Sequence, residues 1–227
     1  MDVIITGSGV NSDVEQQIDR THLSGRVTIR PLEHKIGLVT GGHFAATAIT
    51  GTIAAGIAAN AQILQIRWAD PTKIFLLKKI TAQGATSTIF TTLFGADLEL
   101  IVGHNSTANG SGGTALALNS TSNRLNSKTM APSGFAGSGE IRIATTAALT
   151  AATGQVLEPA GIGYGRAAPF AANTTLPKFS LFDRVDPTAH PLVLQLGDTL
   201  VVRTPNPGAS GVWSVGFEIE WIEVVDY

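Results

Sequence analysis

The 227-residue sequence contains no cysteine, and only 14% of its residues are charged, compared with about 25% in an average globular protein. The absence of cysteine excludes a disulfide scaffold, a thiolate zinc site and a cysteine nucleophile. The low charge indicates that other subunits cover part of the surface, because a free monomer usually presents more charge to water. The net charge is −2 and the densest basic run is only Lys78-Lys79, so we expect no nucleic-acid binding through phosphate neutralisation.

Signals for a membrane are also missing. Residues 1–6 lack a basic region followed by an apolar core, so they do not read as a secretory signal. The most apolar stretch, residues 44–61, consists largely of alanine, glycine and threonine and is interrupted by Gly51 and Gly56. We expect strands and turns there instead of a membrane span. The sequence therefore predicts a protein that is made and folded in the cytoplasm and has no membrane partner.

Apolar residues at alternate positions are the main structural signal from Arg26 onward. The clearest strand is near the C-terminus, where five apolar residues share one face: Trp213, Val215, Phe217, Ile219 and Trp221. Similar alternation occurs at 64–68, 98–102, 141–143, 192–196 and 200–202. These runs amount to roughly eight to ten strands with turn signals between them and no convincing long helix, which predicts an all-β sandwich or barrel. We expect one β domain over residues 26–227.

Other segments give weaker signals. Residues 1–25 form an N-terminal arm that is either flexible or ordered by a neighbouring subunit, and Ser12 can cap a short helix or turn reaching Asp19. The alanine-rich stretch 145–154 has some helical propensity, which its threonine pairs and short length weaken. Residues 158–178, rich in glycine and proline, are predicted to be loop. Val202 and Trp213 are expected to pair in a hairpin across residues 205–211.

No catalytic motif is present in the sequence. None of the five histidines is two or four residues from another, so neither an H-x-H pair nor an H-E-x-x-H helix occurs. The Gly-Ser-Gly runs at 110–112 and 137–139 lack the spacing of a nucleophile elbow. The glycines of 161–165 lack the strand and helix of a phosphate loop. We therefore expect no enzymatic activity, no cofactor and no metal.

The carboxylates Glu218, Glu220 and Glu223 gather near the C-terminus, and Glu218 and Glu220 share one face of the expected strand. Such a pair can imitate a glycosidase site. A polar stripe facing solvent or another subunit, opposite the apolar face, is the preferred interpretation. Trp68 can mark a sugar platform, but its place in the alternation from Leu64 favours core packing.

Candidate subunit-contact residues lie in two regions of the chain. Asp183 and Asp186 flank Arg184, and His190-Pro191 follows; a local ion pair would fix the chain before the strand that begins at Leu192. Arg124 lies in an otherwise nearly uncharged loop between Gly103 and Gly139. Long loops of this kind are typical of binding or assembly surfaces, or of disorder. We therefore name Arg124, Asp183, Arg184 and His190 as candidate contacts between subunits.

Several segments resemble proteins encoded among the virion genes of tailed phages and prophages. They are Ile63-Leu64-Gln65-Ile66-Arg67-Trp68-Ala69-Asp70, Asn123-Arg124-Leu125, Leu181-Phe182-Asp183-Arg184, His190-Pro191-Leu192-Val193-Leu194, Gly211-Val212-Trp213 and Glu220-Trp221-Ile222-Glu223-Val224. The resemblance implies a jelly-roll-like antiparallel β-sandwich with long loops. It implies a virion structural protein, first of all a capsid decoration (cement) subunit that forms a homotrimer and clamps neighbouring copies of the major capsid protein.

Two other functions remain open on the sequence. A carbohydrate-binding or receptor-binding β-sandwich of a phage tail or head fibre would need exposed aromatic rings beside polar loops, and Phe135, Tyr164 and Phe170 are the rings to inspect. A β-fold enzyme such as a cupin or glycosidase would need a metal or a carboxylate pair in a cleft.

Overall fold

The computed structural model describes residues 15–17, 26–28, 42–54, 57–90, 96–118, 133–136, 139–166, 174–183, 191–207 and 210–225. The chain divides into two units, Met1–Lys35 and Ile36–Tyr227. In the smaller unit, β1 (Glu15–Gln17) pairs antiparallel with β2 (Arg26–Thr28). The strand expected from Arg26 is therefore present. The helix or turn expected between Ser12 and Asp19 is wrong for residues 15–17, which are extended because they pair with β2.

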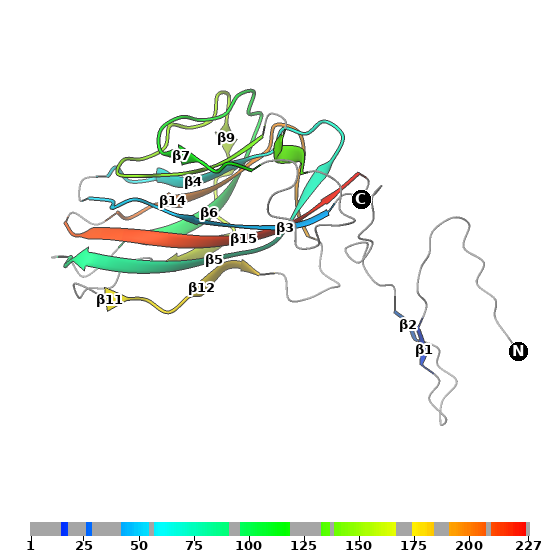
Figure 1. Ribbon diagram of the computed structural model, residues 1–227, viewed down its shortest axis with the longest axis horizontal. Helices are drawn as coiled ribbons and strands as arrows, with labels where there is room; N and C mark the ends of the chain where they lie inside the picture. Colours follow the sequence, from blue (N-terminus) through cyan, green and yellow to red (C-terminus); the bar gives the residue numbers. More distant parts are fainter. Residues whose placement is uncertain are drawn as a thin grey trace, which may run out of the picture. The chain divides into compact units, whose positions relative to one another are not determined.

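The larger unit is an all-β sandwich of two antiparallel sheets packed face to face (Figure 1), as the sequence predicts. Besides one short 3₁₀ turn, η2 (Gly134–Ala136), its described residues form only strands and irregular segments. The strands are β3 (Gly42–Ile49), β4 (Ala61–Arg67), β5 (Ile74–Thr88), β6 (Asp97–His104), β7 (Thr114–Ala115), β8 (Glu140–Ile143), β9 (Val156–Leu157), β10 (Gly163–Arg166), β11 (Thr174–Thr175), β12 (Phe179–Asp183), β13 (Leu192–Leu194), β14 (Thr199–Thr204) and β15 (Val212–Val224).

The strand order is that of a jelly roll. Sheet I runs β3-β15-β5, and β11, β12 and β13 follow one another along the far edge of β5. Sheet II runs β7-β8-β4-β14-β6, and β9 and β10 follow one another along the far edge of β6. Each of these edge groups can be counted as one strand, and β7 and β8 can be left out as an insertion. The eight remaining strands, numbered 1 to 8 along the chain, then lie in the order 1-8-3-6 in sheet I and 2-7-4-5 in sheet II. Two interleaved Greek keys give this order.

The core lies between the two sheets and is supplied by the alternating positions of the central strands. All five apolar residues of the C-terminal strand signal are buried in β15. At one end of the sandwich, an aromatic cluster joins both sheets to η2; its rings are Phe44, Trp68, Phe75, Phe135 and Trp221. Trp68 is fully buried there, as its alternation with Leu64 and Ile66 predicts. Each such side chain contributes about 1.5–3 kcal/mol through its removal from water.

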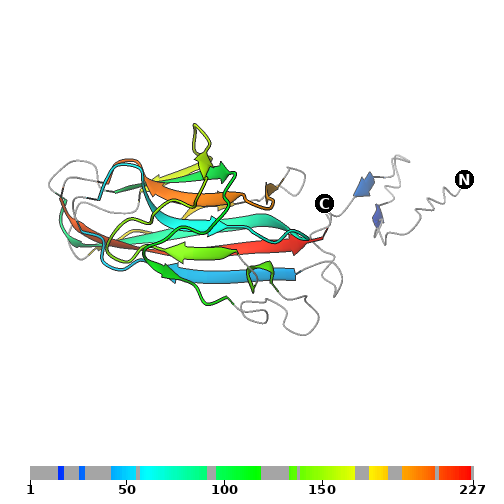
Figure 2. The same cartoon turned by 90° about the horizontal axis from the view of Figure 1, so that it is seen from above.

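The outer face of sheet II is covered around β4 by the chain itself. Segments around residues 106–111 and 149–155 cross over β4 (Figure 2). Hydrogen bonds of polar side chains connect them to this strand. Gln65 accepts from the Gly110 amide at 3.2 Å and donates to Gln62 at 2.8 Å, and Arg67 donates to Asn109 at 3.0 Å. Because these buried side chains form hydrogen bonds, the free-energy cost of removing them from water is offset. Strand β4 is consequently buried on both faces.

Two expectations about the chain path are wrong. Val202 and Trp213 do not form a hairpin, because β14 belongs to sheet II and β15 to sheet I, and the chain between them crosses from one sheet to the other. The segment 158–178 is not all loop, since it contains β10 and β11. In β10, Gly163 and Gly165 face Leu181 and Phe179 of β12, where a Cβ would overlap their atoms. The glycines are there to let the two sheets approach, so they do not signal a loop.

Candidate binding surface

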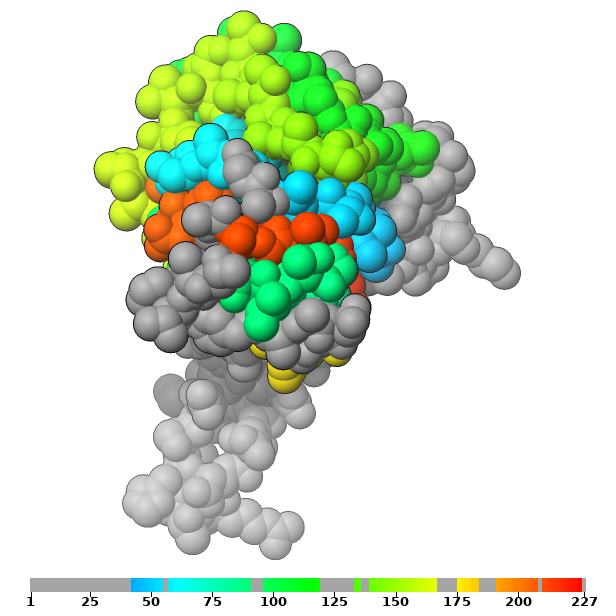
Figure 3. Space-filling model, turned by 90° about the vertical axis from the view of Figure 1, so that its left-hand side faces the viewer, coloured from blue at the N-terminus to red at the C-terminus, as the bar shows by residue number. Residues whose placement is uncertain are grey.

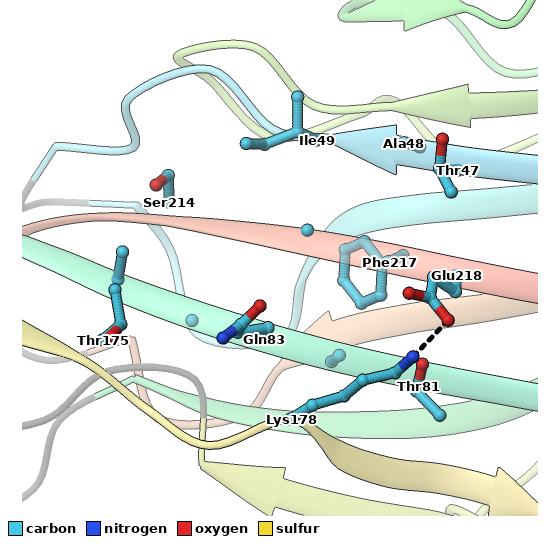
Figure 4. Close-up of a pocket in the computed structure, with 14 residues that line it drawn as sticks. Thr47, Ala48, Ile49, Thr81, Gln83, Thr175, Lys178, Ser214, Phe217 and Glu218 are labelled. Atoms are coloured by element: carbon cyan, nitrogen blue, oxygen red, sulfur yellow. Dashed lines mark hydrogen bonds and ion pairs between the residues drawn. The ribbon is translucent and has the colours of Figure 1, made fainter.

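Sheet I carries a depression of about 440 Å³ on its outer face, across β3, β15 and β5 (Figure 4). Its floor is low because the residues there are small. A Cβ added to Gly216 would lie 4.0 Å from the carbonyl oxygens of Ala48 and Gln83, so nothing fills the space above this glycine. Ile49, with 70% of its surface exposed, forms one wall. Figure 3 shows the end of the sandwich at which β3 and β5 end and β15 begins.

The lining of the depression is largely apolar or small, and most of its polar groups are uncharged. Its one ion pair joins Lys178 to Glu218, and the Gln83 side-chain amide donates to the Leu176 carbonyl at 3.3 Å. Hydroxyl groups come from Thr47, Thr81, Thr175 and Ser214. Among the described residues, the buried Thr81 hydroxyl has no hydrogen-bond partner. A surface of this kind can bind backbone amides or sugar hydroxyls, because it offers donors and acceptors without a strong net charge.

A band of ion pairs crosses sheet I beside the depression. The His43 imidazole and the Glu220 carboxylate are 2.7 Å apart, and Lys79 lies 3.2 Å from Asp183. Glu218 and Glu220 thus lie on the outward face, as predicted, each with a basic partner on another segment.

Of the four candidate contact residues, the structure describes only Asp183. Asp183 is exposed at the end of β12, and its ion pair is with Lys79 on the neighbouring strand. Arg124, Arg184 and His190 lie outside the described residues. Whether a local Asp183–Arg184 pair fixes the chain before β13 therefore stays a prediction.

Glu223 is a buried carboxylate whose position the sequence reasoning missed. One of its oxygens accepts from the Ser133 hydroxyl at 2.6 Å and from the Trp221 indole at 3.0 Å. The other accepts from the Gly134 amide at 2.8 Å and lies 3.5 Å from the Lys73 ammonium. Burial raises the pKa of Glu223, while these donors act in the opposite direction. The site holds the start of η2 against the end of β15.

The period-two pattern contained the signal for Glu223. Positions 213, 215, 217, 219 and 221 face the core, and position 223 is the next in that series. Glu218 and Glu220 belong to the opposite face. We grouped the three acids by proximity in sequence, whereas alternation along a strand separates Glu223 from the other two.

An exposed tyrosine lies on the other sheet. Tyr164 on β10 has 60% of its surface exposed, and its pKa is raised by burial of its hydroxyl and by a hydrogen bond with Asp97. Asp97 is buried and also accepts from Arg166 at 3.1 Å. Of the other two rings named for sugar binding, Phe135 packs inside the aromatic cluster and Phe170 lies outside the described residues. Of the three rings, Tyr164 is therefore the one that the structure places at the surface, and it lies in a strand, not in a loop.

His104 at the end of β6 bridges two carboxylates. Its Nδ1 lies 2.8 Å from Asp198 and its Nε2 lies 2.9 Å from Glu158. The hydrogen bond with Asp198, followed by that with Glu158, raises the pKa of His104 above the ordinary 6.5. The bridge ties β6 to the turn before β14 and to the segment after β9.

This bridge predicts a pH-dependent stability. Because the folded-state pKa is raised, the stabilisation by His104 is fully present below pH 6.5 and is lost as the pH rises through the folded-state value. His104→Gln is expected to lower stability by no more than about 1 kcal/mol at pH 6, since the pair is partly solvated, and by less at pH 9. Urea unfolding of both proteins at the two pH values checks this. An equal loss at both values would contradict it.

The described histidines are both engaged in ion pairs, and His22, His34 and His190 fall outside the described stretches. Within those stretches, no group of three or more histidine, aspartate or glutamate side chains is arranged to hold a metal ion. The described residues also contain no helix with the length and apolar character needed to cross a membrane.

Comparison of the chain with protein-family models, curated proteins and solved structures returned no match.

Proposed function

We propose that this chain is a non-enzymatic structural subunit of a virion, and first of all a capsid decoration protein that binds the major capsid protein. Three things support the proposal: the resemblance of several segments to virion proteins of tailed phages, the jelly-roll strand order, and the low charge. Jelly rolls serve in viral capsids but also in lectins and cupins, so the fold alone does not choose among them.

The observation that carries the proposal is the asymmetry between the two sheets. The chain's own segments cover the outer face of sheet II around β4, whereas the outer face of sheet I has an open depression with a floor of small residues across its central strand β15. Another protein surface can approach such a floor closely, and the polar groups around it can satisfy the partner's backbone amides. We assign the capsid contact to this outer face of sheet I.

A contact of this type suits a clamp on a symmetric shell. Each interface between capsid subunits is modest, and symmetry repeats it many times. A subunit that binds only the assembled shell stabilises that state by mass action, with no need for a catalytic group. The near-neutral charge of the depression makes its binding depend on fit more than on long-range attraction.

The direct test is binding to capsids. Purified chain is mixed with expanded capsids built from the major capsid protein of the same genome, and bound chain is measured by sedimentation. We expect saturable binding and particles that resist heating better when occupied. Absence of binding, together with normal particle stability when the gene is deleted, would contradict the proposal.

A carbohydrate-binding or receptor-binding role is the second candidate, and two observations favour it. Tyr164 is exposed beside Asp97 and Arg166, and the depression on sheet I carries several hydroxyl groups and the Gln83 amide. A glycan array separates the two roles. Binding to a glycan that Tyr164→Ala abolishes, with no binding to capsids, would replace the decoration role by this one.

A further inference from the structure

Strand β3 forms one edge of sheet I, and within the described part of the chain its outer row of backbone groups has no partner strand. It pairs with β15 on one side, and no described strand pairs with it on the other. The amide of Thr50 donates to Val215 at 3.0 Å, and this pair continues the register of β3 with β15. In an antiparallel ladder the bonded positions alternate. Even-numbered residues of β3 therefore bond to β15, and the amides and carbonyls of Ala45, Thr47 and Ile49 point to the free edge.

The other edges of sheets I and II have features that prevent pairing with a further strand. The far edge of sheet I consists of three short strands, with a register irregularity between Ser180 and Phe182 and charges at Lys178 and Asp183. In sheet II, one edge is the two-residue β7, and the other is the short pair β9 and β10. Short strands, bulges and charges are the features by which proteins prevent edge-to-edge pairing.

Strand β3 has none of these features. It is eight residues long, has no proline, and its register with β15 is continuous. Its one ionisable side chain, His43, sits at the beginning of the strand. The following residues are small or apolar, and Ile49 at the end is 70% exposed. An uninterrupted, nearly uncharged edge of this length is a template for another strand.

We propose that β3 pairs antiparallel with β3 of a second copy of this chain, which joins the two copies of sheet I into one continuous sheet across a two-fold axis. A two-fold contact requires a surface that is complementary to itself. An antiparallel strand edge meets that requirement, because each outward amide of β3 can donate to an outward carbonyl of β3 in the second copy. The small side chains of Ala45 and Thr47 place nothing bulky or charged in the way. This inference does not depend on the role in a virion.

The contact has a consequence for assembly. It produces a dimer, and each partner's depression lies beside β3, so the two depressions become parts of one wider surface. This differs from the homotrimer that the resemblance to decoration proteins implies. The mass of the purified chain in solution distinguishes the two arrangements.

The first test is Thr47→Pro. Proline removes the outward amide of residue 47 and obstructs the free edge, while it leaves the bonds to β15 in place. The wild-type chain is expected to have the mass of a dimer by light scattering after size exclusion, and Thr47→Pro that of a folded monomer. The matched variant Ala48→Pro removes an amide that bonds to β15, so it is expected to lower the melting temperature instead. A monomeric or trimeric wild type would overturn the inference.

A second test does not need proline to be tolerated. Because the chain has no cysteine, single cysteines at Ala45, Thr47 or Ile49 are the only thiols present. A short bis-maleimide is expected to cross-link at least one of these variants into a dimer at low protein concentration. The control is Thr146→Cys, on an exposed loop after β8, which should stay monomeric in the gel. No cross-link at any of the three β3 positions would equally overturn the inference.

Discussion

Replacement of Glu223 by alanine is expected to lower the free energy of unfolding by about 3 kcal/mol, or roughly 6–12 °C in melting temperature for a domain of this size. The variant leaves the Ser133 hydroxyl, the Trp221 indole and the Gly134 amide without their acceptor, and it leaves the Lys73 ammonium without its nearby carboxylate. Buried donors that lose their acceptor retain the full cost of leaving water.

The matched control for this change is Glu218→Ala on the same strand. Glu218 lies on the outward face and is largely exposed, so its loss is expected to change stability by no more than about 0.5 kcal/mol. Thermal unfolding followed by tryptophan fluorescence reports both effects, because Trp221 donates directly to Glu223. Equal melting temperatures for the two variants would contradict the assigned role.

The pH dependence of this site has a definite sign. Burial raises the folded-state pKa of Glu223, so the folded state binds its proton more tightly than the unfolded chain does. The contribution of this group to stability therefore decreases as the pH rises from the unfolded-state pKa to the raised folded-state value. In Glu223→Ala this part of the pH dependence is expected to be absent. Urea midpoints measured across the acidic range test it.

Gly163→Ala is expected to produce the second large effect. A Cβ on this residue would overlap the Leu181 carbonyl oxygen, so β10 and β12 must separate at the place where the two sheets meet. Overpacking of this kind costs about 1–3 kcal/mol, and the upper end applies because the obstacle is backbone. The expected result is a lower melting temperature without a change of fold.

Gly216→Ala provides the comparison for this glycine. Both residues lie in strands, but a Cβ on Gly216 would have no described atom closer than 4.0 Å. Alanine there is expected to leave stability unchanged or to raise it by about 0.5–1 kcal/mol, since glycine loses more chain entropy on folding. If both variants lost the same stability, the close approach of β10 and β12 would not be the cause.

The sequence predicts the architecture well where one face of a strand is buried. Alternation along β15 and β8 identifies them, because their inner side chains are buried against the opposite sheet and most of their outer ones are not. The same rule misses β10, whose inward positions are Gly163 and Gly165. There the tight approach of the sheets demands the smallest residue, so the strand carries no apolar signal.

The binding surface is harder to predict for a related reason. The depression exists because Gly216 has no side chain and because β3, β15 and β5 lie side by side. The sequence of a single segment does not determine which strands lie next to it in a sheet. The predicted hairpin of Val202 with Trp213 was wrong for the same reason, because strand order cannot be derived from the two segments alone. Neighbours in sequence belong to different sheets in a jelly roll, since the chain crosses between the layers.

The most direct test of the proposed function is to place a bulky charge in the depression and measure capsid binding. Gly216→Arg fills the open space above the floor of sheet I, and Thr146→Arg puts the same side chain on an exposed loop after β8. In sedimentation with capsids, we expect the wild type and Thr146→Arg to bind alike, and Gly216→Arg, folded by circular dichroism, to stay in the supernatant. Gly216→Arg binding as tightly as the wild type would contradict the claim that the outer face of sheet I is the docking surface.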